Sequence, residues 1–410
     1  MDILFITDNF PPETNAPASR TFEHAMEWAG MGHEVNVITC APNFPFGKIY
    51  DGYQNRIFQR ENMNGINVYR VWSYMTRNKG LLKRILDFMS FMFSAILGSF
   101  RVTRPDVVIA TSPQLFSAVA GYLVGKLKRC PFIFEVRDLW PEQILVVKAM
   151  KQNVVIRLLF RLAGYLYHHA DRVVTVGDGY KEQIQAGYNV SDEQIDVIPN
   201  GILPEMFSKN GRRNKIRKQL GWDRKFVVLY LGTHGMSHKL ETVMEAAELL
   251  KSSLELCFAF VGDGAEKEKL LRIKDDKKLD NCLFYMMQPR EKVPDFYEAA
   301  DACVIPLLRC ELFRGNYPSK MFEAMAMECP IILSSEGYSR KLLNEAKAGI
   351  SVLPEDPGQL AQGVQYLYQH PDECMQMGRR GREFVLENYS RKVWAKRYVD
   401  LIGRVVNEEK

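Results

Sequence analysis

Short apolar segments alternate with longer segments of helical periodicity along the whole chain. Most of the apolar segments lack strict alternation of polar and apolar positions, which is typical of strands covered on both faces. The first set of such segments lies at residues 3–7, 35–39, 67–71, 106–111, 132–136, 172–176 and 195–199. The second set lies at residues 227–232, 256–262, 282–287, 301–307, 330–335 and 349–354. Strands that alternate with helices predict βαβ units and parallel sheets.

A polar, basic stretch at residues 209–225 interrupts this pattern, and the turn-rich sequence PNGILP precedes it at 199–204. A domain boundary is therefore expected near PNGILP. We predict two doubly wound, Rossmann-like α/β domains that face a central cleft. The first spans residues 1–200 and the second 201–389, and a last helix within 390–410 packs back on the first. Because ligands of open α/β sheets bind at the carboxyl ends of the strands, functional residues are sought in the loops that follow strands.

The composition narrows the class of protein. The chain has 410 residues, of which 47% are hydrophobic and 25% charged, and this balance excludes a disordered chain or a disulfide-rich mini-fold. The net charge of +5 is too small to predict a nucleic-acid partner. The eight cysteines are scattered singly, and the first residues, MDILFITDNF, read as a strand, so no secretory signal is expected. A cytoplasmic, reducing location is expected.

One apolar segment, residues 85–100, allows more than one interpretation. It contains a single acid, Asp87, and is shorter than the ~20 residues that a spanning helix needs. It can be a buried helix whose side chains Phe88, Phe91, Met92 and Ile96 face the domain core. It can also lie on an anionic membrane as an amphipathic helix, since basic residues flank it. These flanking residues are Arg77, Lys79, Lys83, Arg84, Arg101 and Arg104.

Two loops of the first domain are candidates for chemistry. The loop after the first strand ends at Asn15 and Ala16, which would open a helix and offer backbone N–H groups to a phosphate, unless the loop is a plain structural turn. The loop RDLWPEQ after the strand at 132–136 places Arg137, Asp138 and Glu142 at a strand end. These three side chains predict an active-site loop. The alternative is a local ion pair that caps a helix at Pro141.

The sequence GNYPSKMFEAMAMECPIILSS, residues 315–335, predicts a helix start followed by a buried strand. Ser319 is a residue type that favours the N-cap position. The helix N-terminus and Lys320 would suit a diphosphate, and Glu323 would accept hydrogen bonds from a ribose diol. A carboxylate in such an apolar helix is costly unless it has a partner, which favours a functional role over helix capping alone.

The turn LGTHGMSHKLE, from Leu231, follows another predicted strand and carries His234 and His238. Two histidines at this spacing invite a metal site, but no carboxylate or cysteine completes the ligand set and Gly235 stands between them. An Asp-x-Asp pair is also absent from the sequence. We therefore predict no metal and no cofactor.

Taken together, these motifs resemble the family 4 glycosyltransferases. The resemblance extends over essentially the whole chain and rests on PPETNAPASR, GHEVNVITCAPNFP, FEVRDLWPE, VIPNGI, VGDGAEKEKL and PSKMFEAMA. It implies the GT-B fold and transfer of a sugar with retention of anomeric configuration. The segments APASR, APNFPFGKIYDGY and RDLWPE are similar to a bacterial subgroup that adds N-acetylated sugars, N-acetylfucosamine among them, during O-antigen or capsule assembly.

Several positions depart from the family pattern. The family has two glutamates eight positions apart; the second matches Glu323, but the first, which contacts the donor sugar, falls on Gly315. The two phosphate-binding cations of the family fall near Thr233 and His238, so Lys320 would supply the charge, with Arg314 or Lys239. Arg137-Asp138 replaces the usual His-Asp. Asn15-Ala16 replaces the usual Gly-Gly of the first loop.

The resemblance implies a metal-independent transferase that moves a sugar from UDP to a polyprenyl-diphosphate-linked saccharide. The second domain would bind the UDP-sugar through Gly232, Ser319, Lys320 and Glu323, and Asp138 or Glu142 would orient the acceptor. The protein is expected on the cytoplasmic face of the inner membrane as a peripheral protein. The alternatives are a UDP-sugar epimerase or hydrolase of the same fold, and a non-catalytic subunit that binds a nucleotide sugar.

Overall fold

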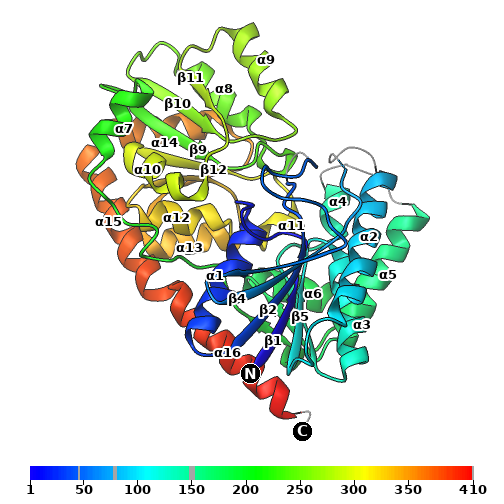
Figure 1. Ribbon diagram of the computed structural model, residues 1–410. Coiled ribbons are helices and arrows are strands. Elements are labelled where there is room, and N and C mark those ends of the chain that lie inside the picture. Colours follow the sequence, from blue (N-terminus) through cyan, green and yellow to red (C-terminus); the bar gives the residue numbers. More distant parts are fainter. Residues whose placement is uncertain (45–46, 77–80, 147–152, 409–410) are drawn as a thin grey trace. The chain divides into compact units, whose positions relative to one another are not determined.

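The computed structural model describes residues 1–44, 47–76, 81–146 and 153–408, and the chain forms two compact units (Figure 1). The first unit comprises Met1–Pro199 together with the C-terminal segment that begins at Arg391, and the second comprises Asn200–Ser390. Each unit is built on a mainly parallel sheet with helices on its faces, which confirms the predicted α/β class.

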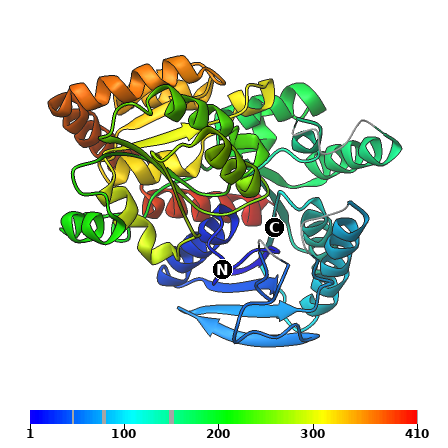
Figure 2. The ribbon, with the colours of Figure 1, turned by 90° about the horizontal axis from the view of Figure 1, so that it is seen from above.

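The sheet of the first unit has eight strands in the order β3-β4-β2-β1-β5-β6-β7-β8. All pairs are parallel except β3 with β4, which are antiparallel. The strands are β1 (Asp2–Ile6), β2 (Glu34–Cys40), β3 (Phe58–Met63), β4 (Ile66–Val71), β5 (Val107–Thr111), β6 (Phe132–Val136), β7 (Arg172–Thr175) and β8 (Ile195–Val197). The turned view shows the antiparallel pair β3 and β4 at one edge of this sheet (Figure 2).

The helices of this unit are α1 (Ala16–Gly30), α2 (Leu81–Ser99), α3 (Leu115–Lys128), α4 (Glu142–Val146), α5 (Val154–His169), α6 (Asp178–Tyr188), η1 (Asp192–Gln194) and α16 (Arg391–Glu408). Two of them, α1 and α16, pack together on one face of the sheet, where Trp28 Nε1 donates a hydrogen bond to the carbonyl of Ala395 at 3.0 Å. The helices α2, α3 and α5 lie side by side along the unit (Figure 1). A Cβ atom built on Gly121 of α3 would meet Ala110 of β5 and Phe132 of β6. Side chains alternate between the two faces of a strand, and the adjacent residues Ile109 and Ile133 belong to the core beneath α1 and α16. Helix α3 therefore covers the opposite face of the sheet.

The sheet of the second unit has six parallel strands in the order β11-β10-β9-β12-β13-β14, which is the order 3-2-1-4-5-6 of a Rossmann fold. The strands are β9 (Phe226–Leu231), β10 (Leu256–Val261), β11 (Cys282–Tyr285), β12 (Ala302–Pro306), β13 (Ile331–Ser334) and β14 (Gly349–Val352). The strand order reverses between β9 and β12, and ligands of such sheets bind at the carboxyl side of this switch point.

The helices of the second unit are α7 (Arg213–Leu220), η2 (Met236–His238), α8 (Glu241–Leu249), α9 (Lys267–Lys277), η3 (Arg290–Lys292), α10 (Val293–Ala299), α11 (Glu311–Arg314), α12 (Ser319–Ala326), α13 (Tyr338–Ala346), α14 (Pro357–Gln369) and α15 (Pro371–Asn388). Apolar side chains form one core on each side of the sheet. Helix α12, which carries three of the predicted site residues, Ser319, Lys320 and Glu323, contributes Met321 and Phe322 to one of these cores.

Each segment that the sequence predicts as a strand contains a strand in the structure. One further strand, β3, was not predicted. Its sequence FQRENM is polar, and its burial alternates because it lies at the edge of the sheet, where β4 is its one neighbour among the described strands. In the described part of the chain, no helix combines the length and apolar composition needed to cross a bilayer.

The apolar segment at 85–100 comprises most of α2 and the residue that follows this helix. Its apolar side chains lie on both the buried and the exposed side of the helix. Phe91 and Met92 are buried in the unit, as the interpretation of a core helix expects, whereas Phe93 and Leu97 are exposed to solvent. The flanking residues Arg77 and Lys79 lie outside the described residues.

Candidate active site

The turn after β9 and the start of α12 meet at the switch point of the second sheet. Gly232, the first residue of this turn, has φ of +138°, a conformation that favours glycine. A Cβ atom built on Gly232 would lie 3.1 Å from Nζ of Lys320, the second residue of α12. The structure therefore brings together two of the residues that the sequence assigned to the nucleotide site.

The Lys320 ammonium lies against Tyr230 at the end of β9. Its Nζ is 3.2 Å from the hydroxyl of Tyr230 and 4.3 Å from the centre of the ring. Burial lowers the pKa of Lys320 to about 8. Among the described residues, no carboxylate lies within ion-pair distance of this ammonium, although Glu323 interacts with it electrostatically. A half-buried cation with aromatic and hydroxyl neighbours is well suited to receive an anion.

Two histidines lie in the same turn region, and burial keeps both neutral. The pKa of His234 is lowered to about 4 and that of His238 is lowered well below its usual value, mainly by burial and in part by Lys320. Both ring nitrogens of His234 are buried without a hydrogen-bond partner in the described part of the chain. Neutral imidazoles can donate or accept a hydrogen bond, but they bring no positive charge to the turn.

The turn after β10 packs closely on the turn after β9. Gly262 has φ of +148°, and a Cβ atom there would lie 1.9 Å from the carbonyl oxygen of Gly232. Any larger residue would push the two turns apart. The glycines of the VGDG sequence thus hold the backbone around Gly232 in place beside Lys320.

Glu323 lies one turn further along α12 and is buried. One of its carboxylate oxygens forms an ion pair with Nη1 of Arg290, from η3, and the other accepts a hydrogen bond from the hydroxyl of Tyr297, from α10, at 3.3 Å. The carboxylate therefore has the partner that an acid in an apolar helix requires. Each carboxylate oxygen has two lone pairs, so these contacts leave acceptor capacity for a ligand hydroxyl.

The prediction that Ser319 caps α12 is wrong. The helix begins at Ser319 itself, Pro318 takes the cap position, and no side chain bonds to the helix start. Pro318 fits this position because its fixed φ and missing N–H suit the entry to a helix. The first N–H groups of α12 therefore have no side-chain cap.

In the first unit, Arg137 and Asp138 follow the end of β6. Their backbone N–H groups donate to the hydroxyl of Ser112 at 2.9 and 3.2 Å. The Arg137 side chain is buried, and its Nε and Nη1 have no hydrogen-bond partner in the described part of the chain. Burial lowers the pKa of Arg137 to about 10, so the group stays charged at neutral pH. Burial raises the pKa of Asp138, whose Oδ1 accepts a hydrogen bond from Gln143 at 2.7 Å.

Glu142, which was predicted to lie in one cluster with Arg137 and Asp138, is bound by a residue of another helix. Its Oε1 accepts a hydrogen bond from the hydroxyl of Tyr188, at the end of α6, at 2.5 Å. Burial raises the pKa of Glu142. The described contacts link Glu142 to α6 and do not link it to Arg137 or Asp138.

Asn15 is the N-cap of α1, as its position at a helix start suggests. Its Oδ1 accepts a hydrogen bond from the N–H of Ala18 at 2.9 Å. Pro17 has no N–H, so within the described structure Ala16 supplies the N–H group that this helix start leaves open. This single donor is a smaller anion site than a full set of open N–H groups would be.

Two family models match the chain, one in each of the two units. Residues 15–201 match the glycosyl transferase 4-like domain, and residues 212–384 match the glycosyl transferases group 1. The chain is a GT-B glycosyltransferase.

Known proteins with similar sequences and structures agree with this assignment. The glycosyltransferase is 28% identical over 377 residues to WcaI of Escherichia coli strain K12, which is provisionally assigned to colanic acid biosynthesis; the match covers 89% of this chain and 91% of WcaI. Sucrose-phosphate synthase of Thermosynechococcus elongatus has the same fold, with a TM-score of 0.82 at 18% identity over 99% of each chain. So does HepE of Anabaena in complex with UDP-glucose, with a TM-score of 0.76 at 14% identity over 98% of this chain and 100% of HepE.

The sequence offered two further cations, Arg314 and Lys239, for the phosphates of the donor, and both lie near carboxylates of the chain. Arg314 is exposed and forms an ion pair with Glu311 at 3.0 Å. Lys239 lies 3.9 Å from Glu241. Neither has a described contact with Lys320 or Gly232, so the geometry singles out Lys320 among the three candidate cations.

The sequence did not identify the side chains that support the predicted residues. Tyr230 ends a buried strand and resembles a core residue, and Arg290 stands 33 positions before Glu323. The only available signal was general: a lone acid in an apolar helix requires a basic partner. The sequence could not show which of many basic residues the fold brings to it.

Proposed function

We propose that this glycosyltransferase transfers an N-acetylated sugar from UDP to a polyprenyl-diphosphate-linked saccharide during the assembly of a bacterial surface polysaccharide such as O-antigen or capsule. The colanic acid assignment of WcaI supports the polysaccharide class. The binding of UDP and UDP-glucose by HepE, which shares the fold, supports the donor class. The reaction would take place at the cytoplasmic face of the inner membrane.

The position of Lys320 carries this proposal. A cation that has no carboxylate partner among the described residues lies at the switch point of a Rossmann-ordered sheet, beside a glycine turn and at the start of a helix. A diphosphate provides the negative charge that this arrangement lacks. Glu323, one turn along the same helix, is then within reach of the ribose diol of the same nucleotide.

The proposed reaction breaks the bond between the anomeric carbon of the sugar and the β-phosphate oxygen of UDP. The acceptor hydroxyl attacks from the same face, which retains the anomeric configuration, and its proton passes to the departing phosphate oxygen. Lys320 and the uncapped N–H groups of α12 stabilise the charge that develops on the diphosphate. This charge stabilisation is what a metal ion supplies in other transferases, so we propose a metal-independent reaction.

In the first unit, Asp138 is the better candidate to orient the acceptor hydroxyl. It stands at the strand end next to Arg137, whereas Glu142 has no described contact with either residue. Each of the two carboxylates has one oxygen already bound, that of Asp138 by Gln143 and that of Glu142 by Tyr188. The buried Arg137 guanidinium has two nitrogens without a hydrogen-bond partner in the part of the chain that the structure describes, and it would contact an anionic or carbonyl group of a substrate. Ala16 would contribute one further N–H group.

Product analysis tests this function. With a UDP-sugar and a lipid extract that contains the acceptor, we expect release of UDP together with a lipid-linked product that retains the anomeric configuration, both in the presence of EDTA. Conversion of the UDP-sugar without an acceptor would instead indicate an epimerase or a hydrolase. No turnover of any UDP-sugar would indicate the non-catalytic subunit, and loss of activity with EDTA would contradict the metal-independent reaction.

A further inference from the structure

Large apolar side chains are exposed along three neighbouring helices of the first unit. On α2 and its end, Leu97 and Phe100 are 68% and 64% exposed, and Leu86 and Phe93 are also exposed. The other exposed members lie on α3 and α5; they are Leu123, Leu127, Val154, Val155, Leu158 and Tyr165. Because α2 packs on α3 and α3 packs on α5, the three helices form one layer (Figure 1), and we call the exposed side chains of this layer the three-helix face. Exposed large apolar side chains gathered on neighbouring helices favour an interaction site.

The charge of the three-helix face has one sign. The three helices contain a single carboxylate, Asp87, and burial raises its pKa to about 7. They carry six lysines and arginines, namely Lys83, Arg84, Lys126, Lys128, Arg157 and Arg161. Within the described structure, none of the six has a carboxylate within ion-pair distance, whereas an exposed lysine elsewhere, Lys209, pairs with Glu328 at 2.6 Å. Apolar side chains among unpaired cations match an anionic lipid surface.

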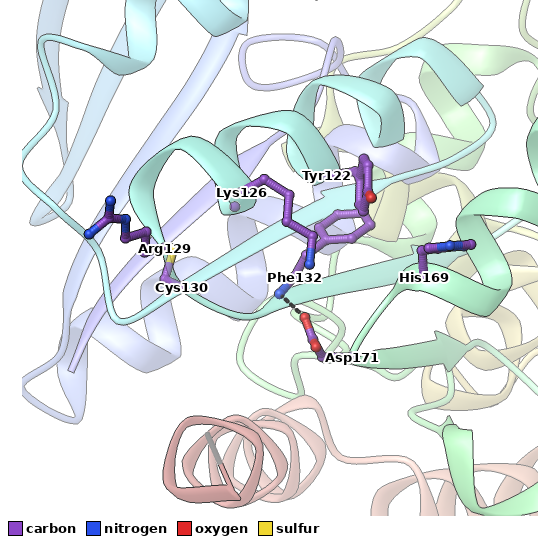
Figure 3. A pocket seen from close by; sticks show the side chains of 8 residues that line it. Tyr122, Lys126, Arg129, Cys130, Phe132, His169 and Asp171 are labelled. Atoms are coloured by element: carbon purple, nitrogen blue, oxygen red, sulfur yellow. Dashed lines mark hydrogen bonds between the residues drawn. The ribbon is translucent and has the colours of Figure 1, made fainter. Parts of the chain in front are cut away.

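A pocket opens where α3 and α5 end. Lys126, Arg129 and His169 line it together with Tyr122 and Asp171 (Figure 3). The Asp171 carboxylate is held by the N–H of Phe132 at 2.7 Å, and no carboxylate pairs with Lys126 or Arg129 among the described residues. The two cations are thus available to an anion.

Aromatic side chains connect this pocket to the three-helix face. The hydroxyl groups of Tyr122 and Tyr165 lie 2.9 Å apart, and the ring of Tyr165 stacks on His169 at 3.9 Å. Tyrosine is typical of the boundary between lipid and water, because its ring is apolar and its hydroxyl is polar.

We propose that the three-helix face docks on an anionic lipid bilayer and that the pocket between α3 and α5 receives a lipid headgroup phosphate. The inference rests on the lipid-linked acceptor proposed above, since such an acceptor would be met at the same surface. It extends the expected membrane contact from the α2 segment to α3 and α5.

Flotation with vesicles tests the charge of the face. The full-length protein is expected to float with vesicles of phosphatidylglycerol and phosphatidylcholine in equal parts, and high salt should release it. The double variant Arg157→Glu, Arg161→Glu should lower the partition at least about 30-fold, since each basic residue contributes ~1 kcal/mol at such a surface. The matched control is Lys215→Glu, Lys218→Glu, which makes the same charge change on α7 of the second unit and should float like the unmodified protein.

A second pair of variants tests the apolar contact. Phe93→Ser with Leu97→Ser should lower the partition at least about tenfold. The control Leu249→Ser with Leu254→Ser removes side chains that are 61% and 76% exposed on the second unit and should have no effect. For the pocket, Lys126→Ala with Arg129→Ala should weaken binding more than Lys83→Ala with Arg84→Ala, and an equal loss would remove the headgroup site.

Several results would overturn the proposal. These are absence of flotation at low salt, equal losses in the control variants, attachment that resists both salt and carbonate, and a lipid-independent dimer that the Phe93→Ser, Leu97→Ser variant abolishes. UDP affinity, measured by calorimetry on the same variants, should stay unchanged, because Lys320 and Glu323 lie in the second unit. If the unmodified protein fails to bind UDP, the proposed function fails while the vesicle result stands.

Discussion

Replacing Lys320 with alanine is expected to lower kcat about 100-fold or more, with a smaller change in KM. The Lys320 ammonium has no carboxylate partner among the described residues, so its charge is available to the diphosphate, and this charge matters most as the diphosphate leaves. Steady-state kinetics of UDP release would measure the effect. Lys239→Ala is the matched control, because the sequence offered Lys239 as an additional cation for the phosphates but the structure places it 3.9 Å from Glu241. The kcat of this variant should change little.

The pH dependence provides a second measurement of Lys320. Its pKa of about 8 means that the free enzyme loses the ammonium charge as the pH rises through this value. We expect kcat/KM to fall above about pH 8 and kcat to fall at a higher pH, because a bound diphosphate raises the pKa of the lysine. A profile that is flat through this range, or a Lys320→Ala variant with full kcat, would contradict the role of Lys320.

Glu323→Gln is expected to weaken UDP binding by about 1.5–3 kcal/mol, the contribution of a hydrogen bond to a charged group. The change also removes the ion pair with Arg290, so the melting temperature should fall as well. Calorimetry with UDP and thermal unfolding would separate the two effects.

Arg290→Met is the matched control for Glu323→Gln. It removes the same ion pair but leaves the carboxylate, and Tyr297 still donates to it. If Glu323 binds the ribose diol, Arg290→Met should retain more UDP affinity than Glu323→Gln. Equal melting temperatures together with unchanged UDP affinity in both variants would show that Glu323 has a structural role only.

Much of the fold could be predicted from the sequence because buried parallel strands have a strong local signal. The strands from β9 to β14 are apolar runs separated by helical periods, a pattern that predicts a parallel sheet built from βαβ units. The order of the strands in the sheet came from the structure. The edge strand β3 has no such signal, because its FQRENM sequence gains its structure from pairing with β4. The two apolar faces of α2 also could not be resolved, since nearly every position of its period is apolar.

The candidate site was predictable at positions where local chemistry determines the geometry. The association of Gly232 with Lys320 follows from a glycine turn after one strand and a helix start before another, at a switch point that the topology fixes. Partners that come from distant segments were not predictable: Arg290 for Glu323, Tyr188 for Glu142, and Tyr230 for Lys320. The position of Ser319 was misjudged by one residue, because Pro318 is equally suited to a helix entry.

The most direct test of the central claim, that the second unit binds a uridine diphosphate through Lys320 and Glu323, is a thermal-shift panel of nucleotides. A ligand at 100 times its Kd adds ~2.7 kcal/mol of stability, which a melting curve detects readily. We predict that UDP and UDP-sugars raise the melting temperature in the presence of EDTA, that GDP and ADP raise it much less, and that Lys320→Ala removes the UDP effect. No shift with any nucleotide, or a full UDP shift in Lys320→Ala, would contradict the claim. An equal shift with all three diphosphates would contradict the preference for uridine, because Lys320 and Glu323 are assigned to groups that the three nucleotides share.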